Sequence, residues 1–162
     1  MTTVWRLHRP IISVPWLSVL TTNQKGAIAE AAIAKEAIEL GIGVYRPYAD
    51  ERCDLIFDLR PRLVRVQCKW ASRERDVLVL RLYSARRARH GLIRRGYSCE
   101  EVDAFAAYAP ATGRCYFLDA SAFEAQTTVL LRVEPTKNNQ AARVRWARDY
   151  EFGATLGGLA GP

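Results

Sequence analysis

Long apolar runs, histidines and recognisable hydrolase motifs are all scarce in this sequence, and each shortage removes a class of protein. No run of about eighteen apolar residues occurs, so we expect no transmembrane helix. The four cysteines form no C-x-x-C pair, and only His8 and His90 could join them, which argues against a zinc site. The chain also lacks a G-x-S-x-G motif and a P-loop, so it carries neither a serine-hydrolase nor a nucleotide-binding signature.

The cysteine spacing and the first residues bear on location. Free cysteine behaves as a small hydrophobe, so we expect reduced thiols and a cytoplasmic protein. Residues 11–20 faintly imitate a secretion signal, but Pro10 and Pro15 interrupt them and no small-x-small cleavage site follows. We therefore expect residues 1–20 to form an N-terminal extension.

Positive charge dominates the composition. Lysine and arginine number 24 against 17 acidic residues, giving a formal net charge of +7, and only four of the cations are lysines. The guanidinium group presents a fork of donors that fits phosphate, and a balance this basic favours a polyanionic partner such as DNA. The alternative is that the arginines are simply solvated, and composition alone does not separate the two.

The 162 residues contain no internal repeat and no linker that would divide them. We predict one α/β domain over residues 21–152, with a mixed central sheet flanked by helices, and a flexible tail over 153–162. A helix capped by Thr22 or Asn23 is predicted to run to about Leu40. Strands are predicted at 44–48, 53–58, 63–70, 77–83, 104–108, 115–118 and 129–133. The basic run 86–95 is predicted as a loop or short helix, 121–126 as a short helical piece, and 138–152 as a final helix.

The stretch from Arg52 to Trp70 organises the chain. It is predicted to form two adjacent strands joined by a tight link over 59–62. Because successive side chains on a strand point to opposite faces, one face of this pair is almost wholly apolar. The other face carries Asp54, Gln67 and Lys69, which would form a compact polar cluster on a rigid platform.

A single acid on the first predicted helix is the second anomaly. At 100° per residue, Glu30 lies in the middle of an apolar stripe made of Gly26, Ala27, Ile33, Ala34, Ala37, Ile38 and Gly41. A buried carboxylate is costly unless a cation, a donor or water meets it. Taken singly, Glu30 could reach solvent or pair with an arginine, Asp54 could be a turn residue, and Lys69 could lie on the surface.

Taken together, these residues resemble the PD-(D/E)xK nuclease superfamily. Glu30 on the first helix, Asp54 opening a strand and Gln67-x-Lys69 on the next are similar to its glutamine variant, found in homing endonucleases of group I introns. The resemblance extends from about Lys25 to Tyr150 and includes Lys25-Gly26, Gly43-Val44-x-x-Pro47, Val102-Asp103-x-Phe105 and Asn138-Asn139-Gln140. Two departures are Cys53 in place of the usual proline and Gln67 in place of an acid, which removes one charge from the metal site.

The resemblance implies a restriction-endonuclease-like core and a Mg²⁺-dependent DNA endonuclease, with Mn²⁺ as a substitute ion. Asp54 would be the central metal ligand, Glu30 would hold the same ion directly or through water, and the backbone carbonyl of Cys68 would be a further ligand. Gln67 would be a neutral ligand or would orient the attacking water. Lys69 would lie beside that water and the scissile phosphate.

Two groups of polar residues are candidates for DNA contacts, in addition to Lys25. The first could follow a phosphate backbone and comprises Arg73, Arg75, Arg86, Arg87, Arg89, Arg94 and Arg95. The second mixes amide and cationic groups and comprises Lys137, Asn138, Asn139, Gln140, Arg143 and Arg145. The alternatives are a solvated basic loop for the first group and a polar helix start for the second.

The substrate stays open among a specific duplex, a branched junction and a repair intermediate. One small site per chain would favour a homo-oligomer, a dimer or a tetramer, for cutting both strands, and no membrane partner is expected. Two alternatives remain: a nucleic-acid-binding protein that keeps the nuclease fold without cutting, and an α/β protein with a different partner.

Overall fold

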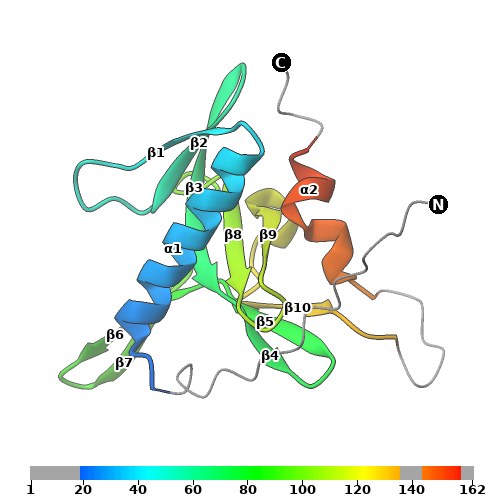
Figure 1. The fold of residues 1–162 in the computed structure, drawn as a ribbon. Coiled ribbons are helices and arrows are strands. Elements are labelled where there is room, and N and C mark those ends of the chain that lie inside the picture. Colours follow the sequence, from blue (N-terminus) through cyan, green and yellow to red (C-terminus); the bar gives the residue numbers. More distant parts are fainter. Residues whose placement is uncertain (1–18, 136–143, 158–162) are drawn as a thin grey trace, which may run out of the picture.

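A mixed five-stranded sheet crossed by one long helix forms the centre of the molecule (Figure 1). The computed structural model describes residues 19–135 and 144–157. Helix α1 (Thr22–Glu39) precedes β1 (Gly43–Tyr45), β2 (Leu55–Leu59) and β3 (Arg62–Trp70), and the sheet is completed by β8 (Ala104–Ala109) and β9 (Arg114–Asp119). The order is β1-β2-β3-β8-β9, with β3 and β8 parallel and the other neighbours antiparallel. The predicted mixed α/β fold is confirmed.

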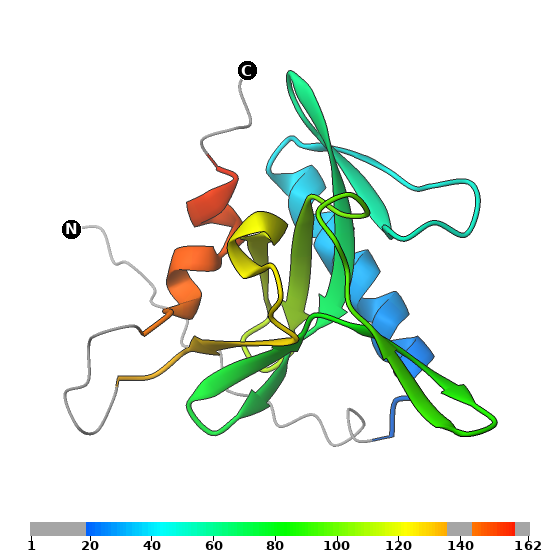
Figure 2. The same ribbon diagram turned by 180° about the vertical axis from the view of Figure 1, so that it is seen from behind.

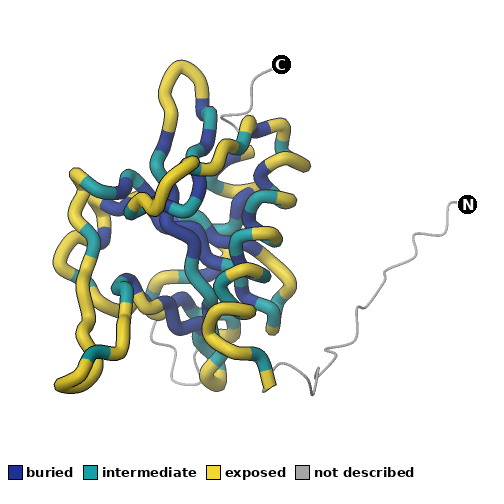
Figure 3. Tube along the Cα trace, turned by 90° about the vertical axis from the view of Figure 1, so that its left-hand side faces the viewer, coloured by how far each residue is buried: buried dark blue, intermediate teal, exposed yellow. Residues whose placement is uncertain are grey.

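A smaller sheet covers the face of the central sheet opposite α1 (Figure 2). It consists of β4 (Ser72–Glu74), β5 (Val77–Arg81) and β10 (Thr128–Arg132), in the order β10-β5-β4. Alternate residues of β8 separate the two apolar cores: Phe105 and Ala107 pack with β5 and β10, whereas Ala104 and Ala106 pack with α1. Figure 3 shows the buried residues as a dark blue centre of the trace, with exposed residues in yellow around it. Among the described helices, none has the length and apolar character needed to cross a bilayer.

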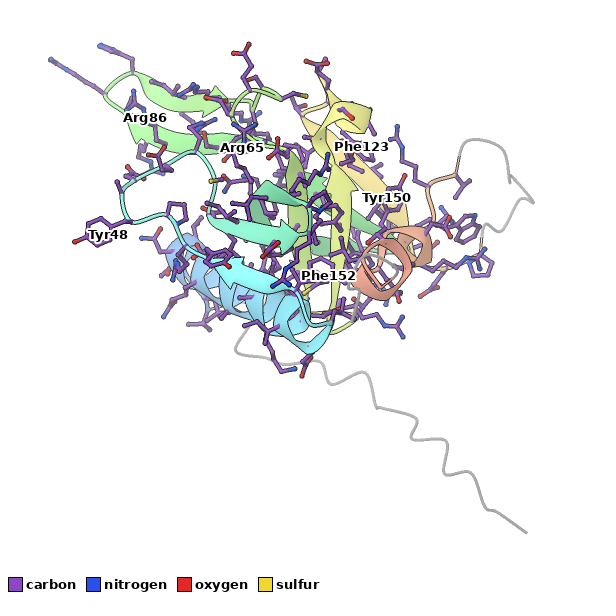
Figure 4. All side chains as sticks on the ribbon, turned by 90° about the horizontal axis from the view of Figure 1, so that it is seen from above. Tyr48, Arg65, Arg86, Phe123, Tyr150 and Phe152 are labelled. Carbon is purple, nitrogen blue, oxygen red and sulfur yellow. The ribbon has the colours of Figure 1, made fainter. Side chains whose placement is uncertain are left out.

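The basic run 86–95 is a β-hairpin, so the predicted loop or short helix is wrong. Strand β6 (Ser84–Ala88) pairs antiparallel with β7 (Gly91–Arg95), and the turn uses Gly91 at a φ of 124°. Arginines occur on both faces of the ribbon, which hides the alternation that marks a strand. The ladder is a separate two-stranded sheet, and Arg86 projects from it away from the body of the protein (Figure 4).

The C-terminal region differs from the predicted long helix over 138–152. In its described part, Trp146 forms a parallel bridge with Arg132, and only a short 3-10 turn, η3 (Ala147–Tyr150), follows. The predicted flexible tail from Gly153 is also wrong at its start, because helix α2 (Phe152–Thr155) continues the chain and Leu156 is buried. Apolar packing decides both points, since Phe152 and Leu156 join the core beneath α1.

The N-cap of helix α1 lies one residue before the positions that were predicted. Thr21, rather than Thr22 or Asn23, is the N-cap: its side chain accepts a hydrogen bond from the Gln24 backbone, and Gln24 reciprocates. The buried stripe consists of Ala29, Ile33 and Ala37, while Ile38 is 61% exposed. Glu30 therefore lies at the border of the buried stripe and not at its centre, about 100° round the helix from Ala29.

Asp103 fastens the start of β8 to β3. Its carboxylate accepts hydrogen bonds from the Arg65 backbone at 2.7 Å, from Nε at 3.0 Å and from Nη2 at 2.8 Å. The Asp103 backbone in turn donates to the Arg65 carbonyl at 2.9 Å. The hydrogen bonds from Arg65 lower the pKa of Asp103 despite an opposing effect of burial.

Replacing Asp103 with asparagine should lower the free energy of unfolding by about 1 to 3 kcal/mol, because charge-assisted hydrogen bonds are lost. Since the folded state favours the carboxylate, its stabilisation is complete above the ordinary aspartate pKa of about 4 and disappears as the pH falls through the lowered folded-state value. Urea titrations of parent and variant should therefore converge in acid. Asp149→Asn, at an exposed and loosely paired aspartate, is the control and should change stability little. A constant difference between parent and Asp103→Asn down to pH 2 would contradict the argument.

Candidate active site

Three of the predicted site residues lie together where β2 begins and β3 ends. The Asp54 backbone donates to the Val66 carbonyl at 3.0 Å, which places Asp54 opposite Gln67. Oδ2 of Asp54 accepts the backbone N–H of Cys68 at 2.7 Å and the side-chain amide of Gln67. Gln67 is only 8% exposed, and its amide nitrogen is also 3.5 Å from the Cys68 carbonyl oxygen. The carboxylate, the amide and that carbonyl are therefore neighbours.

Glu30 approaches the same cluster from α1. Its Oε2 pairs with Nη2 of Arg46 at 2.5 Å, and its side chain is 26% exposed. Burial raises the pKa of Glu30, and the negative charge of Asp54 raises it further, while Arg46 acts in the opposite direction. Glu30 is thus within electrostatic reach of Asp54. It also forms an ion pair with Arg46, which was the alternative interpretation of this residue.

The two carboxylates are only partly compensated by the protein. Burial raises the pKa of Asp54, although the Cys68 N–H, Lys69 and Gln67 each favour its charged form. Burial also raises the pKa of the Cys68 thiol, which packs in the apolar core with α1, so the group of this residue that neighbours the carboxylate is its backbone carbonyl. Burial thus disfavours the charged forms of both Glu30 and Asp54. Additional positive charge at this site would stabilise the two carboxylates.

Lys69 is held on the same polar face by two partners. Its Nζ donates to the Tyr97 hydroxyl at 3.0 Å and to the Tyr83 carbonyl at 3.2 Å, and it lies 4.5 Å from the centre of the Tyr97 ring. Burial lowers the pKa of Lys69 to about 8, and Asp54 opposes this shift. Beside it opens a groove of about 820 Å³ whose lining includes Trp70, Tyr83 and Arg94. Lys69 therefore connects the carboxylate cluster to an open, basic surface.

The donor set fits a divalent cation. Hard divalent ions choose oxygen ligands, and Glu30, Asp54 and the Cys68 carbonyl supply them. The part of the chain that the structure describes contains no group of three or more histidine, cysteine, aspartate or glutamate side chains arranged around one metal. The position where a third acid would be expected holds Gln67, whose amide nitrogen faces Asp54.

The predicted DNA-contacting residues that the structure describes occupy four separate places, and Arg94 and Arg95 share the first of these, the β6–β7 hairpin, as residues of β7. Arg86, Arg87 and Arg89 lie on the exposed β6–β7 hairpin and its turn. Arg73 and Arg75 lie at the β4–β5 turn, where Arg73 pairs with Glu134, and Lys25 lies on α1 with Nζ 5.9 Å from the Trp70 ring. Asn138, Asn139 and Gln140, with Lys137 and Arg143, fall outside the described residues. Arg145 is turned toward the fold, over Phe123 and against Gln126.

Sequence reasoning missed the side chains that hold the site. Arg46 pairs with Glu30, the Tyr97 hydroxyl accepts a hydrogen bond from Lys69, and Arg52 lies over the Tyr97 ring. Each of these three residues lies in a loop without periodicity. Only Arg52 carried a usable signal, because it is two residues before Asp54. The Glu30 and Lys69 partners depend on contacts across 16 and 28 residues, which local patterns do not reveal.

The class of protein follows from this arrangement. A helix that carries a partly buried glutamate crosses a mixed sheet, and two paired segments of that sheet carry an aspartate and a glutamine-x-lysine sequence. This combination is typical of restriction-endonuclease-like nucleases. A sequence model of the PD-(D/E)XK endonuclease family matches residues 20–153, and the chain belongs to that family. The resemblance expected from the residues is thereby confirmed, and with it nuclease as the functional class. Nucleases of this family generally use divalent metal ions and act on DNA.

A solved structure supports the same placement. The chain is similar to the bacterial homing endonuclease I-Ssp6803I, with 27% identity, a TM-score of 0.66, and coverage of 82% of this chain and 89% of the other. No curated protein matches the sequence. The fold similarity extends over most of both chains.

Proposed function

We propose that this protein is a Mg²⁺-dependent DNA endonuclease whose nuclease domain spans residues 21–152. The observation that carries the proposal is the convergence of Asp54, Gln67 and Lys69 on one face at the end of β3, with Glu30 within electrostatic reach. Mg²⁺, for which Mn²⁺ would be a substitute, would supply positive charge and an activated water for phosphodiester hydrolysis. We further propose a cytoplasmic location, consistent with four free thiols.

Each residue of the cluster would have a separate role in metal binding or catalysis. Asp54 and Glu30 would hold the ion, with the Cys68 carbonyl as a third oxygen donor. Gln67 would fix the Asp54 carboxylate through its amide N–H, because that contact is the one it makes in the fold. Lys69 would stabilise the negative charge that develops on the scissile phosphate, since its ammonium is preorganised by Tyr97 and the Tyr83 carbonyl.

Three substrates fit this proposal: a specific duplex, as for a homing enzyme, a branched junction, and a repair intermediate. Each chain would supply one such cluster, so cutting both strands would favour at least a dimer, with a tetramer as the alternative that the family resemblance suggests. The deciding experiment incubates the protein with supercoiled plasmid and with a four-way junction, with Mg²⁺ and with EDTA. Cleavage restricted to Mg²⁺ or Mn²⁺ supports the proposal, and intact DNA under all conditions would refute it.

A second candidate is a nucleic-acid-binding protein that keeps the fold without cutting. Gln67 favours it, because a neutral amide replaces an acid and presents nitrogen, which cannot ligate a cation, toward Asp54. Such a protein would shift DNA in a gel equally with Mg²⁺ and with EDTA, and would leave no nicks. The plasmid assay therefore separates the two candidates directly.

The exposed hairpin should account for part of the salt-dependent affinity for DNA. Changing Arg86, Arg87 and Arg89 together to glutamine should lower the slope of log K against log salt by about two to three, because each phosphate contact releases counterions. Binding isotherms at several salt concentrations measure this slope. The paired control changes Arg60 and Arg62 at the β2–β3 turn, which should leave it unchanged. Equal slopes for the hairpin variant and the parent would remove the hairpin from the DNA surface.

A further inference from the structure

The two partners of Lys69 are the two ends of the β6–β7 hairpin. Tyr83, whose carbonyl accepts from Nζ at 3.2 Å, immediately precedes β6, and Tyr97, whose hydroxyl accepts at 3.0 Å, follows β7 by two residues. The lysine thus closes the base of the ribbon and holds both of its ends. A change in the direction of the hairpin would move the groups that orient the ammonium.

Arg52 connects the same base to the strand that begins with Asp54. Its guanidinium donates to Ser84 Oγ at 3.3 Å, at the start of β6, and to the Gly96 carbonyl at 2.8 Å, just after β7. It also donates to Glu101 at 3.2 Å and lies 4.2 Å from the centre of the Tyr97 ring. Arg52 and Lys69 therefore both contact Tyr97, and both form hydrogen bonds with residues at the base of the hairpin.

The hairpin has little else to fix its direction. Its ladder pairs with no other strand in the described residues, and all of β7 is exposed. Glu101, outside the hairpin, pairs with Arg95 at the end of β7 and with Arg52. A ligand that reorients the hairpin would consequently displace the contacts at its base, where Arg52, Tyr97 and Lys69 lie.

We propose that Tyr97 and Arg52 are positioning residues that couple the orientation of the β6–β7 hairpin to the Lys69 ammonium, so that DNA held by the hairpin sets the lysine for cleavage. This inference rests on the proposed nuclease function. It assigns the basic ribbon a second task beyond affinity. It also predicts that the hydroxyl of Tyr97 contributes to the cleavage step and not to DNA binding.

The test replaces Tyr97 with phenylalanine, which keeps the ring and removes the hydrogen bond to Lys69. Single-turnover cleavage at saturating DNA should slow about five- to twentyfold, while the dissociation constant stays within twofold of the parent. The matched control is Tyr116→Phe, which removes another buried hydroxyl that is hydrogen-bonded to Thr112 at 2.9 Å, and should leave the rate unchanged. Arg52→Gln should behave like Tyr97→Phe.

A double-mutant cycle separates positioning from general loss of structure. When Lys69 is already methionine, Tyr97→Phe should change the residual rate less than twofold, because no ammonium remains to be oriented. An equal effect of Tyr97→Phe in both backgrounds, or a parent-like rate in the single variant, would overturn the proposal. An unchanged rate with altered affinity would overturn it too.

A second measurement does not depend on cleavage. The chain has four lysines, so NMR of protein labelled at the lysine ε-carbon gives few signals, and the Lys69 signal is the one lost in Lys69→Met. Duplex DNA added without divalent ions should shift that signal in the parent and shift it less in Tyr97→Phe and Arg52→Gln. An unaltered Lys69 signal on DNA binding would refute the coupling whether or not the parent cleaves DNA. A shifted Lys69 signal in a parent that does not cleave DNA would refute the nuclease proposal, and with it the role of the coupling in cleavage, but not the coupling of the hairpin to Lys69.

Discussion

Replacing Asp54 with asparagine is expected to slow DNA cleavage by about a hundredfold or more while the protein still folds and binds DNA. Asparagine keeps the size of the side chain and an oxygen that can accept the Cys68 N–H now bonded at 2.7 Å. It loses the negative charge with which the site would hold a divalent cation. Loss of one preorganised charge typically costs about 3 to 4 kcal/mol of barrier, which corresponds to a factor of about 10² to 10³.

The measurement is single-turnover cleavage in Mg²⁺ over a series of metal concentrations, with DNA affinity determined in EDTA. Affinity should be equal to or higher than that of the parent, because a negative charge near the phosphate has been removed. Asp58→Asn is the matched control, since Asp58 lies on β2, four residues after Asp54, but pairs with Arg60 outside the cluster. Parent-like cleavage by Asp54→Asn would exclude Asp54 from the metal site.

The central part of the fold followed from local patterns. In β2 and β3 the apolar residues Leu55, Phe57, Val64 and Val66 recur at every second position, which indicates both the strands and their buried face, and the observed register pairs them. The strands predicted at 104–108 and 115–118 correspond to β8 and β9. In β2 and β3 the burial of this one apolar face dominates the energetics, so a one-residue slip would expose the whole apolar set.

Elements stabilised by longer-range contacts were not predictable in the same way. The β6–β7 ribbon has little apolar content, and its base is held by Arg52, Lys69 and Glu101, which come from other parts of the chain. The described C-terminal residues 144–157 form a 3-10 turn and a short helix in place of one long helix, because Phe152 and Leu156 pack into the core. Neither arrangement leaves a period of 2 or 3.6 in the sequence.

The candidate site shows the same division between local and distant information. Asp54, Gln67 and Lys69 could be placed on one face because strand geometry dictates it. The sequence also showed that Glu30 is an acid beside apolar helix positions. Its exact position, however, depends on how α1 is rotated about its axis against the sheet. The residue in the buried stripe is Ala29, and Glu30 lies at the border of that stripe. The partners Arg46 and Tyr97 required the folded chain.

Lys69 provides the other prediction with a large effect. Replacing it with methionine should slow cleavage about a hundredfold or more, because the ammonium is the positive charge aimed at the developing phosphate charge. Burial disfavours this ammonium and lowers its pKa to about 8, so the folded protein bears a cost for keeping it. Methionine is similar in length and apolar, and should remove that cost. We therefore expect the thermal midpoint of Lys69→Met to equal or exceed that of the parent.

Opposite changes in rate and stability would identify Lys69 as functional, since a residue kept for structure would lose both together. Lys35→Met is the matched control: Lys35 is an exposed lysine on α1 paired with Glu39, and its removal should leave the cleavage rate unchanged. Cleavage rates and thermal unfolding of the three proteins, measured in one buffer, decide the point. A parent-like rate in Lys69→Met would contradict its role, and it would equally deny the hairpin base any lysine to orient for cleavage.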